Sequence, residues 1–235
     1  MHYDKEVNLL DLLFPRRCVG CGKFSSYFCA DCTKTIKRSI LLCPVCEKPA
    51  IDGITHPRCH TRYSLDGLIS FFKYEGIIRQ AIKTLKYRFV TDLSEEFVEL
   101  IPAELFSQLT MQQLNNETIL IPIPLHPSRL RFRGFNQAEV LGKLLANRLN
   151  IPIRIDILKR VKKTIPQVEV KDRKKRLANM EGVFTFNNLT IQQLNNNSIL
   201  LFDDVFTTGA TLRSAANVLK RTGAKTVWGI TLAHG

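Results

Sequence analysis

The chain has 235 residues, and its 34 Lys and Arg against 21 Asp and Glu give a formal net charge of +13. This length fits one main hydrophobic core with a small accessory module and is short for two full enzyme domains. The charge favours anionic ligands such as phosphates, nucleotides or nucleic acid, but it does not indicate a fold. Because no apolar run is long enough to span a bilayer, we expect no transmembrane segment and a cytoplasmic location.

All seven cysteines lie in the first 63 residues. The apolar patch at residues 9–14 carries an aspartate and stops at Pro15, so we interpret it as a packing helix rather than a signal peptide. Three Cys-x2-Cys pairs follow, and a His-x2-Cys pair supplies a fourth. This spacing lets both side chains of each pair reach one tetrahedral ion, which favours zinc over disulfides. The predicted ligands are Cys18, Cys21, Cys29, Cys32, Cys43, Cys46, His56 and Cys59.

The spacing leaves open how these ligands pair around one or two zinc ions. We favour a sequential arrangement, with the first four ligands in one site and the last four in another, over a crossed one. His60 competes with His56 for the second site. Free or disulfide-bonded cysteines are disfavoured in a chain without a secretory signal. The predicted zinc is structural, because a module this small buries too little apolar area to fold without metal.

From residue 64 onward, apolar strands alternate with amphipathic helices, which is typical of a domain built from βαβ units. We therefore expect an N-terminal zinc-ribbon module (residues 1–63) and an α/β domain (64–235) with a parallel sheet flanked by helices. In chain order the predicted elements are a strand at 68–74, helices at 76–87 and 94–109, the second with a possible break at Pro102, a strand at 119–123, a loop and a helix capped by Asn136, weaker strands at 151–157 and 182–186, a buried strand at 199–205, a helix at 211–221 and a strand at 226–232.

Positive charge is concentrated in two places. Residues 154–176 contain ten Lys or Arg against three acids, and Arg129, Arg131 and Arg133 form a second cluster. A charge run by itself usually marks a solvated face. The first run, however, lies in a long excursion between two predicted strands, and loops of that length in compact domains are usually functional or disordered.

The strand at 199–205 leads through a threonine-rich turn into the helix at 211–221. A helix N-terminus presents backbone N–H groups and partial positive charge, which suit a phosphate. Asp203 and Asp204 are unlikely to be buried for stability alone, since each carboxylate would need a partner. They suit the two vicinal hydroxyls of a ribose. A merely capped helix is the alternative, and it explains the threonines and Gly209 but not the aspartates. The predicted ligand-binding residues are Asp203, Asp204, Thr207, Thr208, Gly209, Ala210 and Thr211.

The segment from Asp203 to Thr211 resembles the signature loop of type I phosphoribosyltransferases. Together with the cysteine module, the resemblance extends over nearly the whole chain to the ComF/GntX family, which is associated with DNA uptake in natural competence. His56 departs from the family pattern, which usually has cysteine there. The other matching segments are residues 13–21, 85–87, 121–124, 133–137, Gln167 and 176–184.

The resemblance implies a phosphoribosyl pyrophosphate-like ligand bound with Mg²⁺. It also implies that residues 124–133 grip the diphosphate, for which the rigid fork of arginine is suited. The family's flexible loop over the active site falls on residues 161–181. The implied diphosphate-binding residues are Arg129, Arg131 and Arg133, with Gln167, Arg173 and Arg176 in the flexible loop.

Two functions remain open at this stage. In the first, the chain is a competence protein that binds the ribose-phosphate, while its zinc ribbons and basic loop contact single-stranded DNA or DNA-uptake proteins; Phe132 and Phe135 are candidates to stack on bases. In the second, it is an active phosphoribosyltransferase with an unknown acceptor. No catalytic base is evident, and His126, the one candidate, sits in a loop where a structural role is the commoner one.

Overall fold

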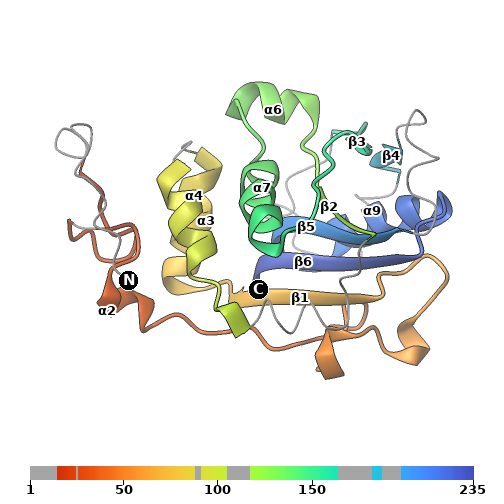
Figure 1. Ribbon diagram of the computed structural model, residues 1–235, viewed down its shortest axis with the longest axis horizontal. Coiled ribbons are helices and arrows are strands. Elements are labelled where there is room, and N and C mark those ends of the chain that lie inside the picture. The colour runs from red at the N-terminus through yellow and green to blue at the C-terminus, as the bar shows by residue number, and fades with distance from the viewer. Residues whose placement is uncertain (1–14, 25, 88–90, 105–116, 164–181, 187–196) are drawn as a thin grey trace.

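A parallel four-stranded sheet with the order β1-β6-β5-β2 forms the centre of the molecule (Figure 1). The computed structural model describes residues 15–24, 26–87, 91–104, 117–163, 182–186 and 197–235. Within them the sheet consists of β1 (Gly67–Lys73), β2 (Thr118–Pro122), β5 (Ser198–Phe206) and β6 (Thr226–His234). All three pairs of neighbouring strands run parallel. The predicted α/β class with a parallel sheet flanked by helices is confirmed.

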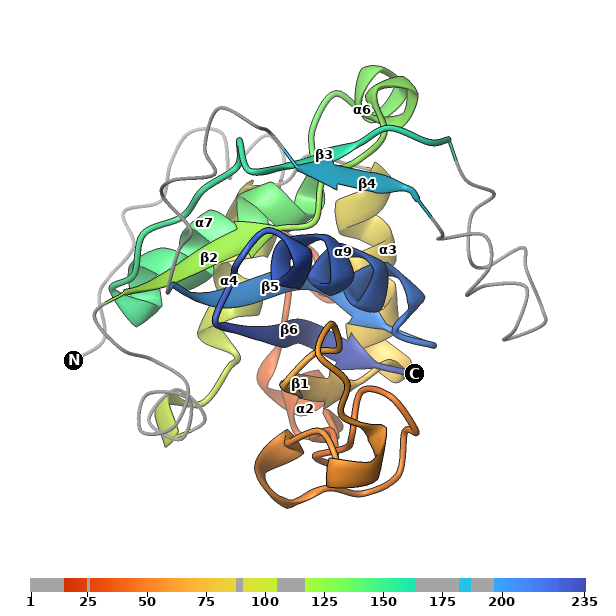
Figure 2. The ribbon, with the colours of Figure 1, turned by 90° about the vertical axis from the view of Figure 1, so that its right-hand side faces the viewer.

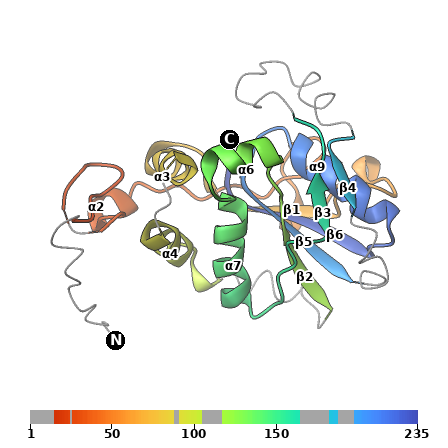
Figure 3. The same ribbon diagram turned by 90° about the horizontal axis from the view of Figure 1, so that it is seen from above.

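The sheet is buried on both faces because its inner strands are apolar at consecutive positions. On β5, Leu200 and Phe202 face one core, whereas Ile199 and Leu201 face the other. The first core lies under α3 (Gly76–Tyr87), α4 (Thr91–Glu99) and α7 (Gln137–Leu149). The second lies under α9 (Ala210–Arg221) and the antiparallel pair β3 (Leu158–Arg160) and β4 (Phe184–Phe186). Figures 2 and 3 show these two layers on opposite sides of the sheet.

Helix ends follow the local signals of the sequence. Asn136 caps α7, with the backbone N–H of Ala138 donating to its side-chain oxygen at 3.1 Å. Past the end of α9, Gly223 adopts a φ of 102°, a backbone conformation that favours glycine. A short helix that the sequence analysis treated as loop, α6 (Pro127–Arg133), begins at a proline and is capped by His126.

Two predicted elements differ from the structure in their extent. The helix predicted at 94–109 begins three residues earlier and is interrupted after Glu99. The break falls at Pro102, where the sequence allowed one, because the residue before a proline disfavours the helical conformation, and helix resumes at Ala103. Residues 105–109 lie outside the described residues. The predicted strand at 151–157 is reduced to a single parallel bridge between Ile153 and Leu120. The chain then leaves the edge of β2, and its regular pairing resumes in β3 with β4, outside the main sheet.

The cysteine-rich segment crosses the exposed edge of β1. Lys37 accepts a backbone hydrogen bond from Lys73 at 2.9 Å, and Ser39 donates one to Phe71 at 3.0 Å. On one side of this crossing Ile36 packs against the core under α3 and α4, and on the other Leu42 is buried in the core under α9. The crossing therefore satisfies backbone groups of an edge strand and places one half of the segment on each face of the sheet.

Glu96 of α4 fastens the first half of the cysteine-rich segment to the α/β core. Its Oε2 atom accepts hydrogen bonds from the backbone N–H groups of Tyr27 at 2.8 Å and Phe28 at 3.3 Å. Phe28 packs on Phe97 of the same helix, with ring centroids 5.4 Å apart. In Figure 3 the short helix α2 (Ala30–Thr33) accordingly lies beside α3 and α4.

Within the described residues, no helix has the length and apolar character that crossing a membrane requires.

We predict that Glu96→Ala destabilises the fold by about 1–3 kcal/mol, because it leaves two partly buried N–H groups without an acceptor. Chemical denaturation of the zinc-loaded chain measures this change. Glu95→Ala removes an exposed carboxylate from the same helix and should change stability by less than about 0.5 kcal/mol. Equal losses in the two variants would show that Glu96 is not the fastening point.

Candidate functional site

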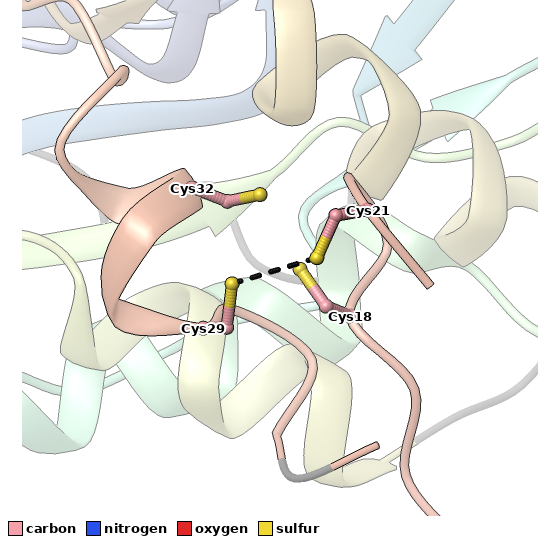
Figure 4. A group of neighbouring side chains, drawn as sticks. All are labelled: Cys18, Cys21, Cys29 and Cys32. Atoms are coloured by element: carbon pink, nitrogen blue, oxygen red, sulfur yellow. Dashed lines mark hydrogen bonds between the residues drawn. The ribbon is translucent and has the colours of Figure 1, made fainter. Parts of the chain in front are cut away.

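The eight predicted metal ligands form two separate groups. Within each group the ligand atoms lie within 4.8 Å of one another, and the grouping follows the order of the chain. In the first group the sulfurs of Cys21 and Cys29 are 3.7 Å apart (Figure 4). The first group consists of Cys18, Cys21, Cys29 and Cys32, and the second of Cys43, Cys46, His56 and Cys59.

His56, rather than His60, belongs to the second group. The Nδ1 atom of His56 is 3.3 Å from the sulfur of Cys46, and its Nε2 atom is 3.1 Å from the carbonyl oxygen of Pro49. If Nε2 carries the proton and donates it to that carbonyl, Nδ1 is free to bind a metal. A backbone carbonyl is a usual partner for the second ring nitrogen of a metal-binding histidine. His60 instead contacts Asp66, with Nε2 at 3.3 Å from the carboxylate.

The chemistry of both groups fits zinc. Burial alone would raise the pKa of the Cys18 thiol, but the N–H groups of Cys29, Cys21 and Gly20 stabilise the thiolate and lower it to about 6. The pKa of Cys32 rises to about 12, first because of its hydrogen bond to Cys29 and then because of burial and its other sulfur neighbours. Four such thiolates repel one another, and a divalent cation removes the repulsion. Each group supplies four tetrahedral-type ligands and no open position, as in structural zinc sites.

Asp204, near the end of β5, is the most strongly held acidic group of the predicted ligand loop. Its buried carboxylate lies 2.9 Å from the ammonium of Lys86, the penultimate residue of α3. The side-chain amide of Gln137, the first residue of α7, donates to the same oxygen at 3.3 Å. Arg133, at the end of α6, donates in turn to the amide oxygen of Gln137. Ends of three helices therefore converge on one carboxylate.

Asp203 is the less stabilised of the two aspartates. Its Oδ1 atom accepts a hydrogen bond of 2.9 Å from the backbone N–H of Asp204. Burial and the neighbouring charge of Asp204 nevertheless raise the pKa of Asp203 to about 7, although Lys86 and Arg160 act in the opposite direction. At neutral pH this carboxyl group is thus poised between its two protonation states, and a nearby cation would favour the ionised one.

The turn after β5 leaves polar groups available beside the start of α9. Gly209 has a φ of 68°, and a Cβ atom at this position would lie 2.6 Å from the ring of Phe206, so glycine is required. The hydroxyl oxygen of Thr208 is buried and has no hydrogen-bond partner among the described residues. A buried hydroxyl without a partner is costly, and a bound oxygen ligand would satisfy it. The first N–H groups of α9 have no acceptor within the helix either.

Basic side chains outnumber the two aspartates around this turn. Burial lowers the pKa of Arg160 to about 10, the charge of Arg129 lowers it further, and Asp203 opposes the change. The pKa of Arg133 is also lowered, mainly by burial and in smaller part by Arg129, against the charge of Asp204. Arg160 is buried, whereas Lys86, Arg129 and Arg133 are half-buried. Positive charge gathered in one place favours an anion there.

The structure brings together only part of the residue set predicted from the sequence. Arg131 is exposed on α6, away from the buried members of this cluster. Gln167, Arg173 and Arg176 lie outside the described residues. His126 caps α6: its Nδ1 atom accepts a hydrogen bond from the backbone N–H of Ser128 and lies 2.7 Å from the hydroxyl of that residue.

Sequence reasoning missed three residues of the cluster. Lys86 and Gln137 stood inside segments that carry the family resemblance, but nothing in the spacing connected them with Asp204. Arg160 was one of many cations in the basic run at 154–176. Its burial in β3, which sets it apart from the others, becomes visible only in the fold.

Comparisons with known proteins give consistent matches over most of the chain. Residues 9–61 match the family described as the double zinc ribbon domain. The chain is 30% identical to competence protein F of Haemophilus influenzae over 222 residues, covering 92% of this chain and 84% of that protein. It is 30% identical to competence protein ComFC of Bacillus subtilis (83% and 78% covered) and 27% identical to DNA utilization protein YhgH of Salmonella typhimurium (85% and 86% covered).

We predict that Asp203→Asn stabilises the protein at neutral and alkaline pH. The folded state raises the pKa of Asp203 from 3.8 to about 7, so between these values unfolding releases a proton and stability falls as pH rises. Asparagine avoids this cost and keeps the oxygen that accepts the hydrogen bond of Asp204.

Thermal unfolding of both proteins should show a higher Tm for the variant at about pH 8 and a gap that narrows toward about pH 5. Asp156→Asn is the control, because the hydrogen bond from Arg154 lowers the pKa of Asp156 and the expected pH dependence has the opposite sign. A difference in Tm between Asp203→Asn and the wild type that stays the same at every pH would contradict the raised pKa of Asp203.

Proposed function

Because the chain belongs to the ComF family of competence proteins, we propose that it serves DNA uptake and that its α/β domain binds phosphoribosyl pyrophosphate or a related ribose-phosphate with Mg²⁺. The observation that carries the proposal is the pair of adjacent carboxylates, Asp203 and Asp204, which lie near the end of β5 beside a helix N-terminus and close to the cations Lys86 and Arg160. We place the protein in the cytoplasm, whose reducing conditions keep zinc-binding thiols available.

The turn from Thr207 to Thr211 is the proposed site of the 5′-phosphate. The N–H groups at the start of α9 and the helix dipole stabilise an anion there. The buried hydroxyl of Thr208, which has no partner among the described residues, would donate to a phosphate oxygen. Gly209 keeps the turn free of a side chain, so backbone and ligand can approach closely.

The two aspartates are the proposed partners of the ribose hydroxyls. Hydroxyl groups donate well to carboxylates, and the carboxylate of Asp204 is held in place by the ammonium of Lys86. Mg²⁺, bound mainly by oxygens of the ligand, would supply positive charge to the diphosphate. Its charge near Asp203 would favour the ionised carboxylate, so ligand binding at neutral pH should be accompanied by loss of a proton from this residue.

Arginine side chains are the proposed partners of the diphosphate. Arg129 repels both Arg133 and Arg160, and burial disfavours the charged forms of these two, so an incoming anion becomes more favourable. Gln167, Arg173 and Arg176 remain predictions, as does Arg131.

The geometry supports ligand binding better than group transfer. Transfer of the phosphoribosyl group would need a site for an acceptor and, for many acceptors, a base to take its proton. The candidate base of the sequence analysis, His126, is engaged in capping α6 through Nδ1. We therefore propose binding as the role of the pocket and keep phosphoribosyl transfer as the alternative function.

We predict that Asp203→Asn/Asp204→Asn abolishes binding of phosphoribosyl pyrophosphate in the presence of Mg²⁺, because it removes both negative charges that strengthen the hydrogen bonds from the ribose hydroxyls and turns one acceptor oxygen of each carboxylate into a donor. Calorimetric titration of the zinc-loaded chain measures the affinity. Asp156→Asn, which neutralises a surface carboxylate paired with Arg154, should bind like the wild type. Folded wild-type protein that binds no phosphoribosyl pyrophosphate would refute the proposal.

Exposed aromatic side chains on the basic surface favour a second candidate function, binding of single-stranded DNA. Phe132 of α6 is 89% exposed, and it lies between Arg131 and Arg133 in the chain. Tyr87, at the end of α3, is 78% exposed, and it is close enough to Arg133 to raise the pKa of that guanidinium. An aromatic ring among cations is the combination that stacks a base while holding its phosphates.

For this second function we predict that Phe132→Ser weakens binding of single-stranded DNA by about 1–3 kcal/mol, the usual contribution of one stacked base. Fluorescence anisotropy with a labelled oligonucleotide at several salt concentrations measures both affinity and salt dependence. Ile51→Ser is the matched control, since Ile51 is 84% exposed on the cysteine-rich segment. The same loss in both variants would argue against stacking on Phe132.

A further inference from the structure

We propose that the second metal cluster, formed by Cys43, Cys46, His56 and Cys59, positions the turn at Gly209, so that metal in this cluster controls the affinity of the ribose-phosphate site. This inference rests on the proposed function for the identity of the ligand. The mechanical link between the cluster and the turn does not depend on it.

The link begins at a close contact between the knuckle at residues 43–46 and the turn. The carbonyl oxygen of Pro44 lies 3.2 Å from the position that a Cβ atom on Gly209 would occupy. The ring of Phe206 lies 2.6 Å from that same Cβ position. The backbone of Gly209 is therefore enclosed by the metal knuckle and an aromatic ring, and a displaced Pro44 would leave it unsupported on one side.

The knuckle is also part of the core that supports α9. Leu42 is 1% exposed and Cys43 is fully buried. Leu42 belongs to the same buried cluster as Phe206, Ala210 and Leu212, which lie just before and after the turn. A movement of residues 42–44 therefore changes the packing of the residues that hold the turn from inside.

The C-terminus closes the arrangement on the other side of Phe206. The N–H of Gly235 donates to the carbonyl oxygen of Phe206 at 3.0 Å, and the ring of His234 lies 5.7 Å from the ring of Phe206. Phe206 is thus fixed by β6, while Pro44 is the contact to Gly209 that comes from the metal module. Of these two contacts with Gly209, the one from the knuckle is therefore the one that metal binding can change.

Metal is what holds the knuckle closed. Two backbone hydrogen bonds shape it, from Cys43 to the carbonyl of Lys48 and from Glu47 to the carbonyl of Cys43, each 2.9 Å long. His56 and Cys59 come from a separate turn and meet the knuckle at the ligand atoms. Without a cation, thiolates brought this close repel one another, and the small module has little apolar area to resist separation.

The first cluster provides an internal control because its contacts lead elsewhere. A Cβ atom on Gly20, between Cys18 and Cys21, would lie 3.1 Å from the side chain of Ile77 in α3. Cys18 and Phe28 are buried against the core under α3 and α4. Metal in this cluster should therefore stabilise those helices and leave the Gly209 turn in place.

The test compares Cys59→Ser with Cys32→Ser, each of which removes the last ligand of one cluster by the same chemical change. Hydrogen–deuterium exchange of the full chain, with zinc content measured in parallel, follows peptides covering residues 206–213 and 77–99. We expect Cys59→Ser to lose zinc and accelerate exchange at 206–213, and Cys32→Ser to accelerate exchange at 77–99. Calorimetry with phosphoribosyl pyrophosphate and Mg²⁺ should show binding at least about tenfold weaker for Cys59→Ser only.

A milder variant, Pro44→Gly, guards against general unfolding, because it keeps all four ligands of the second cluster and loosens only the knuckle. It should keep its zinc and bind phosphoribosyl pyrophosphate about threefold more weakly, the size of a proline-to-glycine backbone effect. The coupling is overturned if Cys59→Ser loses zinc without any change at 206–213, or if the two cysteine variants accelerate the same peptides. Wild-type protein that binds no phosphoribosyl pyrophosphate, with the exchange difference intact, would refute the proposed ligand and leave the coupling standing.

Discussion

Two adjacent carboxylates at the end of a buried strand are the constraint around which the site is organised. Asp203 and Asp204 are among the last four residues of β5, a mostly buried strand in which unpaired charge is expensive. The fold offsets this cost for Asp204 with Lys86 and Gln137, taken from the ends of two helices on the same face of the sheet. It offsets the cost only in part for Asp203, whose pKa remains raised to about 7. The residual instability is of the kind that functional sites carry and structural ion pairs do not.

The same neighbourhood contains an opposite imbalance in positive charge. Arg160 is buried in β3 and lies near Arg129, and burial and repulsion both disfavour its charged form. The acidic and the basic groups sit on different elements, β5 on one side and α6 with β3 on the other. A ligand with hydroxyl donors at one end and phosphates at another would match both imbalances at once.

The sequence was sufficient for features that depend on local pattern. The apolar run of β5, the cap of α7 at Asn136 and the glycine turn at Gly209 each follow from a few neighbouring residues. The signature segment and the Cys-x2-Cys pairs are likewise local, so the candidate ligand loop and the metal groups were predictable. Lys86, Gln137 and Arg160 were not, because their roles arise from contacts between elements far apart in the chain. The strand predicted at 151–157 failed for a related reason: its apolar residues were read as sheet, but only Ile153 bridges to β2.

The crossing of the β1 edge by residues 37–39 also bears on how the chain is made. The other neighbour of β1 is β6, which is synthesised after the other three strands of the sheet. Until β6 has been made, β1 has no partner in this sheet, and a strand with open backbone groups is a template for unwanted pairing. The segment that lies antiparallel to the outer edge of β1 is synthesised before β1 itself. A metal-loaded cysteine-rich segment can thus shield β1 in the nascent chain until β6 arrives.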